Sequence, residues 1–177
     1  MAFIVQSTVL FLWLVAGTAY AEQLAGRVVG VHDGYNITIM DQGNQQHKIR
    51  IGGIDAPELK QAFGNTAKKS LSDLVFNQNV IVDWRKRDQY RRIVGKVLSS
   101  PPDCPSCPAD RDVGLAQVEA GMAWWSREFR KEQTLADQGY YEFAEFVSKR
   151  ERRGLWQDDD PIPPWEWRKR YARAREM

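Results

Sequence analysis

One cation and two carboxylates lie close together in a short segment of the chain, and together they could act on a phosphate ester. Arg50, Asp55 and Glu58 fall in Arg50-Ile-Gly-Gly-Ile-Asp55-Ala-Pro57-Glu58, an apolar, strand-like run that breaks at a proline. A guanidinium can neutralise a phosphate oxygen, one carboxylate can hold a metal ion, and the other can orient or deprotonate water. The same residues also fit the end of an ordinary β-hairpin with surface charges, so the rest of the chain must decide.

The elements that would position these side chains form a β-rich pattern followed by helices. Alternating apolar residues and turn signals predict strands at residues 27–31, 37–40, 47–54, 80–84 and 93–98. Helical spacing predicts helices over 61–76, 113–122 and 133–153, the last with a buried stripe of Ala136, Tyr140, Phe143, Ala144 and Val147. Five strands with a helix inserted after the third predict an α+β fold, a five-stranded OB-type barrel capped by about three helices.

Length and composition favour one packed domain with short extensions. The chain has 177 residues, of which 43% are hydrophobic and seven are tryptophan, so disorder is excluded for most of it. We expect a domain over residues 22–157 and a Pro- and Trp-rich basic tail over 158–177. The net charge of +2 is no general sign of nucleic-acid binding, but the basic residues are clustered. Such clusters can follow a phosphate backbone, although solvated helix faces show the same pattern.

The first 21 residues predict a secretory signal peptide. They carry no charged side chain, contain an apolar run at 9–16, and end in Ala19-Tyr20-Ala21, which fits the small-x-small cleavage rule. Glu22 would then begin the mature chain, a monomer in the periplasm or outside the cell with no membrane span. An uncleaved anchor is the alternative, although the run is short for a membrane span.

The two cysteines, in Cys104-Pro-Ser-Cys107, predict a small structural disulfide. A zinc site would need a second ligand pair, and a redox-active pair would need a strand-to-helix context, whereas prolines surround this one. In an exported protein, a disulfide that staples a loop is the simplest interpretation.

Four motifs, in this order and spacing, make the sequence similar to the staphylococcal nuclease family. They are Val31-His-Asp33-Gly34, Arg50 to Glu58 as quoted above, Asp88-Gln-Tyr90-Arg-Arg92, and Gly121-Met-Ala-Trp124-Trp125 with the later Arg152-Arg-Gly154-Leu-Trp156. The closing Pro163-Pro-Trp-Glu-Trp-Arg168 resembles exported bacterial members. The resemblance covers nearly the whole mature chain.

The resemblance implies a five-stranded OB barrel with three helices and calcium-dependent cleavage of DNA and RNA. By motif, Arg50 and Arg92 would bind phosphate, and Glu58 would orient or activate the attacking water. Asp55 and the backbone carbonyl of Ala56 would be ligands of the calcium ion, which favours hard oxygen ligands of this kind.

The chain departs from the family pattern at two positions. Where the family reads Asp-Gly-Asp-Thr, this chain reads Asp33-Gly34-Tyr35-Asn36, so that Tyr35 replaces a metal-binding aspartate. A phenol with a pKa of about 10 is neutral near pH 7 and is a poor calcium ligand. Tyr90 matches a family tyrosine beside the phosphate pocket. Arg91 stands where the family has a glycine between that tyrosine and Arg92. It adds a cation but strains the backbone if that position needs a positive φ.

Three interpretations of Tyr35 remain open at this point. The chain is an active nuclease with weakened or rearranged metal binding, a catalytically impaired OB barrel that binds nucleic acid through Arg50, Arg91 and Arg92, or a barrel whose first hairpin is shifted by one residue. The apolar pattern around the hairpin argues against the shift. The retained Asp55 and Glu58 favour the nuclease. A structural or adaptor role at the cell envelope is a third class of function.

Overall fold

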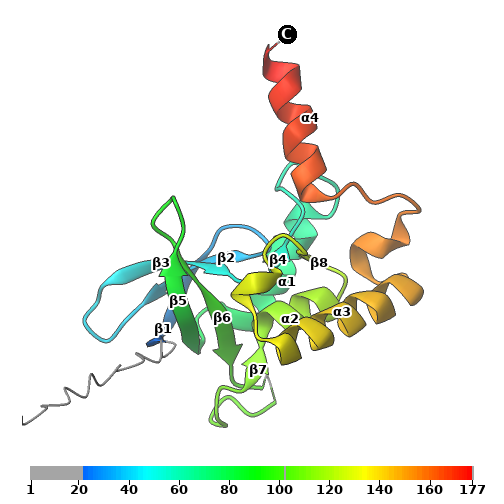
Figure 1. The fold of residues 1–177 in the computed structure, drawn as a ribbon. Helices are drawn as coiled ribbons and strands as arrows, with labels where there is room; N and C mark the ends of the chain where they lie inside the picture. Colours follow the sequence, from blue (N-terminus) through cyan, green and yellow to red (C-terminus); the bar gives the residue numbers. More distant parts are fainter. Residues whose placement is uncertain (1–21, 102, 177) are drawn as a thin grey trace, which may run out of the picture.

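Five strands close into a barrel in the computed structural model, which describes residues 22–101 and 103–176 (Figure 1). The barrel strands are β1 (Glu22–Val31), β2 (Asn36–Met40), β3 (Gln46–Ile51), β5 (Asn79–Arg87) and β6 (Ile93–Ser99). They lie in the order β3-β2-β1-β5-β6, and a pairing between β3 and β6 closes the sheet on itself. The predicted α+β fold with a five-stranded OB-type barrel is therefore confirmed, while the predicted signal peptide lies outside the described residues.

The closing pair, β3 with β6, is parallel, whereas the other barrel pairings are antiparallel. Arg50 lies opposite Val94 on β6 and is also paired with Asn36 on β2. Because successive side chains of a strand point to opposite faces, Ile49 and Ile51 enter the core while Arg50 leaves it. The barrel interior is filled by β-branched side chains that are at most 2% exposed, namely Val28, Ile37, Ile39, Ile49, Ile51, Val80, Val82, Ile93 and Val97.

Three helices pack on one side of the barrel, and a fourth stands apart from them (Figure 1). The three are α1 (Gly64–Val75), α2 (Val113–Glu119) and α3 (Leu135–Arg150), and the fourth is α4 (Pro164–Glu176). The short elements are β4 (Ile54–Asp55), β7 (Arg111–Asp112), β8 (Trp124–Trp125) and the 3-10 turns η1 (Arg130–Glu132) and η2 (Gly154–Gln157). Helix α1 buries Ala67, Leu71 and Val75, a stripe at i, i+4 and i+8. Within the described residues, no helix combines the length and the apolar character that a membrane span needs.

The predicted buried stripe of α3 is largely wrong. Tyr140 and Phe143 are 64% and 67% exposed, whereas Tyr141, Ala144, Glu145 and Ser148 are buried. The helix is turned this way because Glu145 accepts a hydrogen bond from the Trp125 backbone N–H (3.1 Å) and pairs with Arg127 (2.6 Å). Polar contacts with distant residues have outweighed the local apolar pattern.

The segment predicted as a basic tail contains α4, and aromatic packing attaches this helix to the domain. Trp165, in its first turn, meets the ring of Trp124 edge to face at 6.3 Å, and Trp124 meets Trp156 in the same way at 5.4 Å. The Gln61 side-chain amide donates a hydrogen bond to the Ile162 carbonyl just before the helix. Edge-to-face pairs of this kind are favourable beyond the area that they bury, and they set the position of α4 beside the turn that follows β4.

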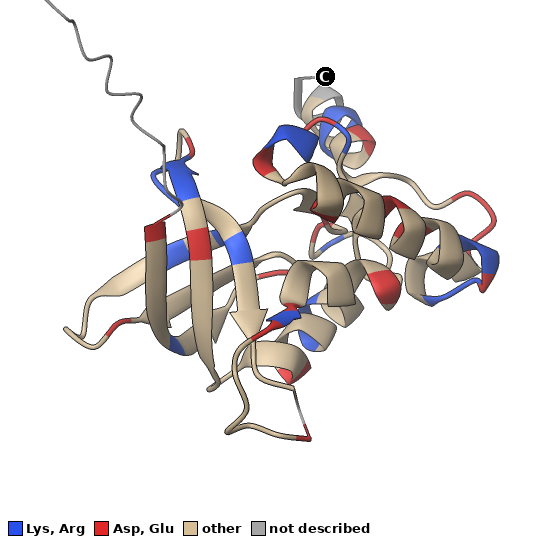
Figure 2. Ribbon diagram, turned by 60° about the horizontal axis from the view of Figure 1, so that its bottom comes forward, with Lys and Arg blue, Asp and Glu red and all other residues tan. Residues whose placement is uncertain are grey.

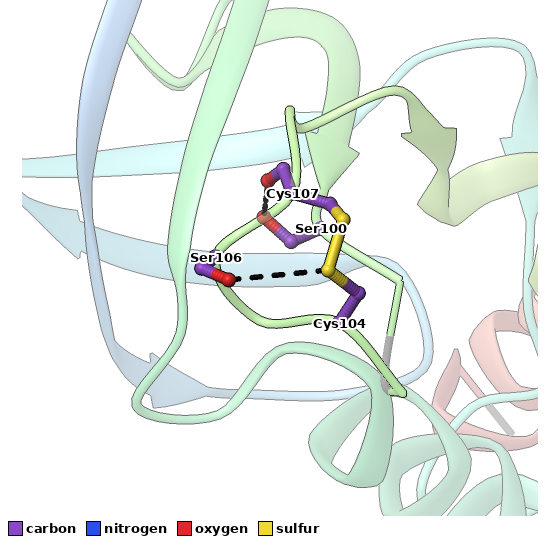
Figure 3. The surroundings of a disulfide bond; sticks show 4 residues. All are labelled: Ser100, Cys104, Ser106 and Cys107. Atoms are coloured by element: carbon purple, nitrogen blue, oxygen red, sulfur yellow. Dashed lines mark hydrogen bonds between the residues drawn. A yellow bond between two sulfur atoms is a disulfide. The ribbon is translucent and has the colours of Figure 1, made fainter.

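A disulfide joins Cys104 and Cys107 in the loop between β6 and β7 (Figure 3). Their Cα atoms are 5.3 Å apart, and the Ser100 hydroxyl donates a hydrogen bond to the Cys107 carbonyl (2.7 Å). The bond therefore fixes a small loop at the end of the barrel where β6 finishes.

Gln117 on α2 provides a test of how the helices hold the β1–β2 turn. This side chain is fully buried and donates to the carbonyls of Gly34 (2.9 Å) and Ala67 (3.1 Å). Gln117→Ala should lower the free energy of unfolding by about 2–4 kcal/mol, because it leaves the Gly34 carbonyl without this donor and opens a small cavity. Urea unfolding followed by circular dichroism measures this change.

The matched control is Gln42→Ala, which makes the same chemical change at an exposed turn position. It should alter the free energy of unfolding by no more than about 0.5 kcal/mol. Equal losses in the two variants would show that Gln117 does not hold the turn.

Candidate functional site

Arg50 is almost completely buried where β3 meets the loop to β4. Its side chain pairs with Glu132 of η1 (2.9 Å) and lies over the Phe129 ring, with 4.2 Å from the guanidinium carbon to the ring centre. Glu132 also accepts a hydrogen bond from the Gly53 backbone N–H (3.1 Å) and pairs with Lys86 (3.0 Å). A buried guanidinium needs such a partner, so Glu132 holds Arg50 and the following turn in one arrangement.

Asp55 lies on β4, which pairs with β8 so that Asp55 is opposite Trp124. Its side chain is 3% exposed, and both of its oxygens contact the guanidinium of Arg168 on α4 (2.7 and 3.3 Å). Burial raises the pKa of the Asp55 carboxyl, while Arg168 and Arg50 oppose that shift. The barrel and α4, which are far apart in the sequence, therefore meet at this carboxylate.

Glu58 follows Pro57 in the turn before α1 and is more exposed than Asp55. Its backbone N–H donates to the Gln61 side chain (3.2 Å), and its own carbonyl accepts from the Gln61 backbone N–H (2.8 Å). A side chain at Gly64 would come within 1.9 Å of the Glu58 carbonyl, so the close approach of α1 to this turn requires glycine there. The Glu58 carboxylate receives a 2.7 Å hydrogen bond from Arg168.

Arg168 is thus a single cation held between two carboxylates. The guanidinium fork suits this geometry, because it offers several N–H groups in one plane. Its side chain is 43% exposed, so one part contacts the buried Asp55 and another part faces solvent. Burial works against the charge, but the hydrogen bonds to Asp55 and Glu58 outweigh it and raise the pKa of Arg168.

Tyr35 lies beside this ion cluster and stays neutral. Burial, followed by the nearby carboxylates of Asp55, Asp33 and Glu58, raises the pKa of the Tyr35 phenol to about 12. The carboxylate of Asp33 accepts hydrogen bonds from the backbone N–H groups of Tyr35 (2.9 Å) and Asn36 (2.8 Å) and from the Asn36 side chain (2.8 Å). Asp33 therefore builds the turn, and its oxygens are engaged by amides.

Arg92 is joined to the same region through Asn36. Its guanidinium pairs with Asp88 (2.7 Å) and donates a 3.0 Å hydrogen bond to the side-chain oxygen of Asn36, the residue that pairs with Arg50 across β2 and β3. Tyr90 is 69% exposed and lies 5.3 Å from the Arg92 guanidinium. Arg91 has a φ of 63°, so a non-glycine residue stands in the left-handed region at a cost on the order of 1 kcal/mol.

Two neighbouring groups of contacts bring the predicted site residues together. One runs from Arg92 through Asn36 to Arg50 and Tyr35, and the other from Asp55 through Arg168 to Glu58; the Asp55 carboxylate influences the pKa of Tyr35. Tyr90 lies at the edge of the first group beside Arg92, whereas the Arg91 backbone bonds with Arg87 and Asp88. The predictions did not include Arg168, Glu132 or Asn36 as partners; the Pro163-Pro-Trp-Glu-Trp-Arg168 motif was the available signal for Arg168.

The oxygen donors around Asp55 do not make a calcium site as they lie. Calcium takes six to eight oxygen ligands, but Tyr35 is neutral, Asp33 is engaged by amides, and both oxygens of Asp55 contact Arg168. Nowhere in residues 22–101 and 103–176 do three His, Cys, Asp or Glu side chains gather closely enough for a metal ion. The position between the two carboxylates holds the guanidinium of Arg168 instead.

Comparisons with known proteins agree with this arrangement of motifs on the barrel. Residues 48–158 match the family described as "Staphylococcal nuclease homologue". The chain is 36% identical to "Micrococcal nuclease" of Shigella flexneri over 157 residues, 88% of this chain and 86% of that protein. It is 35% identical to "Protein ParB" of Escherichia coli over 163 residues (92% and 89%) and 32% identical to an "Uncharacterized endonuclease" of Haemophilus influenzae over 166 residues (94% and 85%). The chain belongs to the staphylococcal nuclease family.

Proposed function

We propose that the protein is a nuclease that hydrolyses phosphodiester bonds of DNA, RNA or both. The observation that carries the proposal is the meeting of Asp55, Glu58 and Arg168 beside Arg50 at the mouth of the barrel. Family membership and relatives named as nucleases support it. The Glu58 carboxylate pairs with Arg168 and is partly exposed, so it can also meet water at the site.

The three arginines differ in how freely they can meet the substrate. Arg168 is the most exposed of them, Arg92 has a side chain that is 23% exposed, and Arg50 is buried and paired with Glu132. In the proposed site, Arg168 and Arg92 contact phosphate oxygens directly. Arg50, which is paired with Glu132, acts on the charge of the site from the interior and does not touch the phosphate.

Glu58 handles the water in the proposed reaction. One of its oxygens accepts from Arg168, which leaves the other for a hydrogen bond from water. As the water oxygen bonds to phosphorus, the bond between phosphorus and the ester oxygen on the opposite side breaks. The proton of the water passes to Glu58, and the departing ester oxygen takes a proton from solvent. The arginines stabilise the charge that gathers on the phosphoryl oxygens.

Substitution of Glu58 tests this role. Glu58→Gln keeps the size of the side chain but removes its ability to take a proton, so the rate of cleavage should fall about 10²–10⁴-fold. The rate is measured on single-stranded DNA, plasmid DNA and RNA, with calcium or with a chelator, and the affinity for an uncleaved oligonucleotide should change far less than the rate.

The control for this test is Glu142→Gln on α3, where the side chain is exposed. It should cleave at the rate of the parent protein. A parent protein that binds these nucleic acids but cleaves none of them under any condition would refute the nuclease and identify a binding barrel.

The calcium that the resemblance implies can be tested by restoring the missing ligand. Because Tyr35 is neutral and Arg168 neutralises Asp55, the double variant Tyr35→Asp, Arg168→Gln gains one carboxylate and loses one competing cation. Its calcium affinity, measured by isothermal titration calorimetry, should exceed that of the parent at least tenfold, and Arg168→Gln alone should give a smaller gain.

The control variant Tyr35→Phe removes only the hydroxyl. Because the pKa of Tyr35 is about 12, the phenol is neutral throughout pH 7–10, and this variant should bind calcium as the parent does. If the double variant gained no affinity, the carboxylates of this region would not be cation ligands.

We also propose that the protein is exported. The disulfide between Cys104 and Cys107 supports this, since disulfides persist mainly in oxidising compartments. When the full sequence is expressed in a bacterium with a secretory pathway, the protein from the periplasm or medium should have an intact mass that begins at Glu22 and is two hydrogens below the reduced form. A cytoplasmic product that retains residues 1–21 would contradict the proposal.

A further inference from the structure

A pocket of about 480 Å³ lies between α4 and the turn after β4. The turn contributes Glu58, Leu59 and Lys60 to its wall, α4 contributes Trp167, Arg168, Tyr171 and Ala172, and the β1–β2 turn contributes Asp33. The pocket therefore shares Glu58 and Arg168 with the candidate site and opens directly beside it. Its volume falls in the range of sites that hold small organic molecules.

One wall of the pocket is aromatic. Trp167 and Tyr171 are one helical turn apart, so their rings lie on the same side of α4, where they stack with centres 6.4 Å apart and an angle of 21° between the planes. Tyr171 is 49% exposed, and Trp167 is partly exposed. A stacked pair that borders a cavity offers a flat apolar surface to a planar ligand.

The charges of the pocket are divided between its parts. The cations of the lining are Lys60, which is exposed at the turn, and Arg168 on the side of the candidate site. Its carboxylates are Asp33, which accepts hydrogen bonds from backbone amides, and Glu58, which pairs with Arg168. Figure 2 shows that Lys and Arg also occur on the strands of the barrel and along α4. A ligand with a planar ring at one end and an anionic group at the other matches this division, and a nucleotide has that structure.

The helix that carries the aromatic wall is fixed at several points. Trp165 packs against Trp124, Gln61 binds the Ile162 carbonyl, and Arg168 pairs with both carboxylates of the site. These contacts place Trp167 and Tyr171 at a set distance from the residues that would handle the phosphate. The wall is thus part of the folded domain.

We propose that this pocket binds one nucleotide of a single-stranded nucleic acid, next to the phosphate that is cleaved. The base stacks on Trp167 and Tyr171, and its phosphate lies between Lys60 and Arg168. The inference rests on the proposed function and adds the form of the substrate, because a base can reach the aromatic wall only when it is unpaired.

The experiment measures binding without cleavage. In the Glu58→Gln background, fluorescence anisotropy gives the affinity for a labelled eight-nucleotide single strand, a duplex of the same sequence and a single strand with abasic sites. Tyr171→Ala and Trp167→Ala should each weaken binding of the single strand about tenfold or more. They should change binding of the duplex and of the abasic strand less than twofold.

Two controls separate the stacking from the fold. Trp167→Phe keeps an aromatic ring and should bind within about threefold of the parent, and Tyr140→Ala removes an exposed aromatic residue of α3 and should have no effect. Thermal unfolding of each variant shows whether the domain stays folded.

The proposal is overturned if the alanine variants bind the normal single strand as tightly as the parent does, or if they lose equal affinity for the normal and abasic strands. Either result can occur in a protein that cleaves nucleic acid, so the failure of this subsite is distinct from the failure of the nuclease. A parent protein that binds the single strand no better than the abasic strand also overturns it.

Discussion

The parallel pairing of β3 with β6 is the interaction on which the rest of the molecule depends. It closes the barrel, and it places Arg50 between Asn36 of β2 and Val94 of β6. Arg92 lies immediately before β6, so the same pairing brings its guanidinium to Asn36. Because parallel strands need a long connection, residues 52–92 between them carry Asp55, Glu58 and α1 around the barrel and back. Closure of the sheet therefore brings Arg50, Arg92 and Asn36 together.

The charge balance of the site depends on a segment outside the barrel. Asp55 is buried, and a buried carboxylate is costly unless a cation or several hydrogen-bond donors accompany it. In a chain where Tyr35 supplies no charge, the guanidinium of Arg168 meets that need and also binds Glu58. The neutral side chain of Tyr35 and the docking of a basic helix fit together, because each limits the negative charge around Asp55.

The parts of the structure that depend on local sequence could be predicted, and those that depend on distant contacts could not. The strands around Ile37–Ile39 and Ile49–Ile51 follow from alternation, and Arg50, Asp55 and Glu58 lie near one another because they are near in the sequence. Glu132 and Arg168 reach these residues only through tertiary packing, and no spacing rule relates them to Arg50 or Asp55. Resemblance to a family indicated a motif at Arg168 without indicating its contact.

The order of α4 in the chain has a consequence for how the protein is made. Residues 164–176 are synthesised after the barrel and after α1–α3, which can pack before Arg168 arrives. Until then, Asp55 and Glu58 lack the guanidinium that pairs with both of them. Docking of α4 then supplies this cation and adds the wall of the neighbouring pocket that the helix carries. A chain that ended before residue 164 would therefore lack both the cation that balances Asp55 and the aromatic wall beside it.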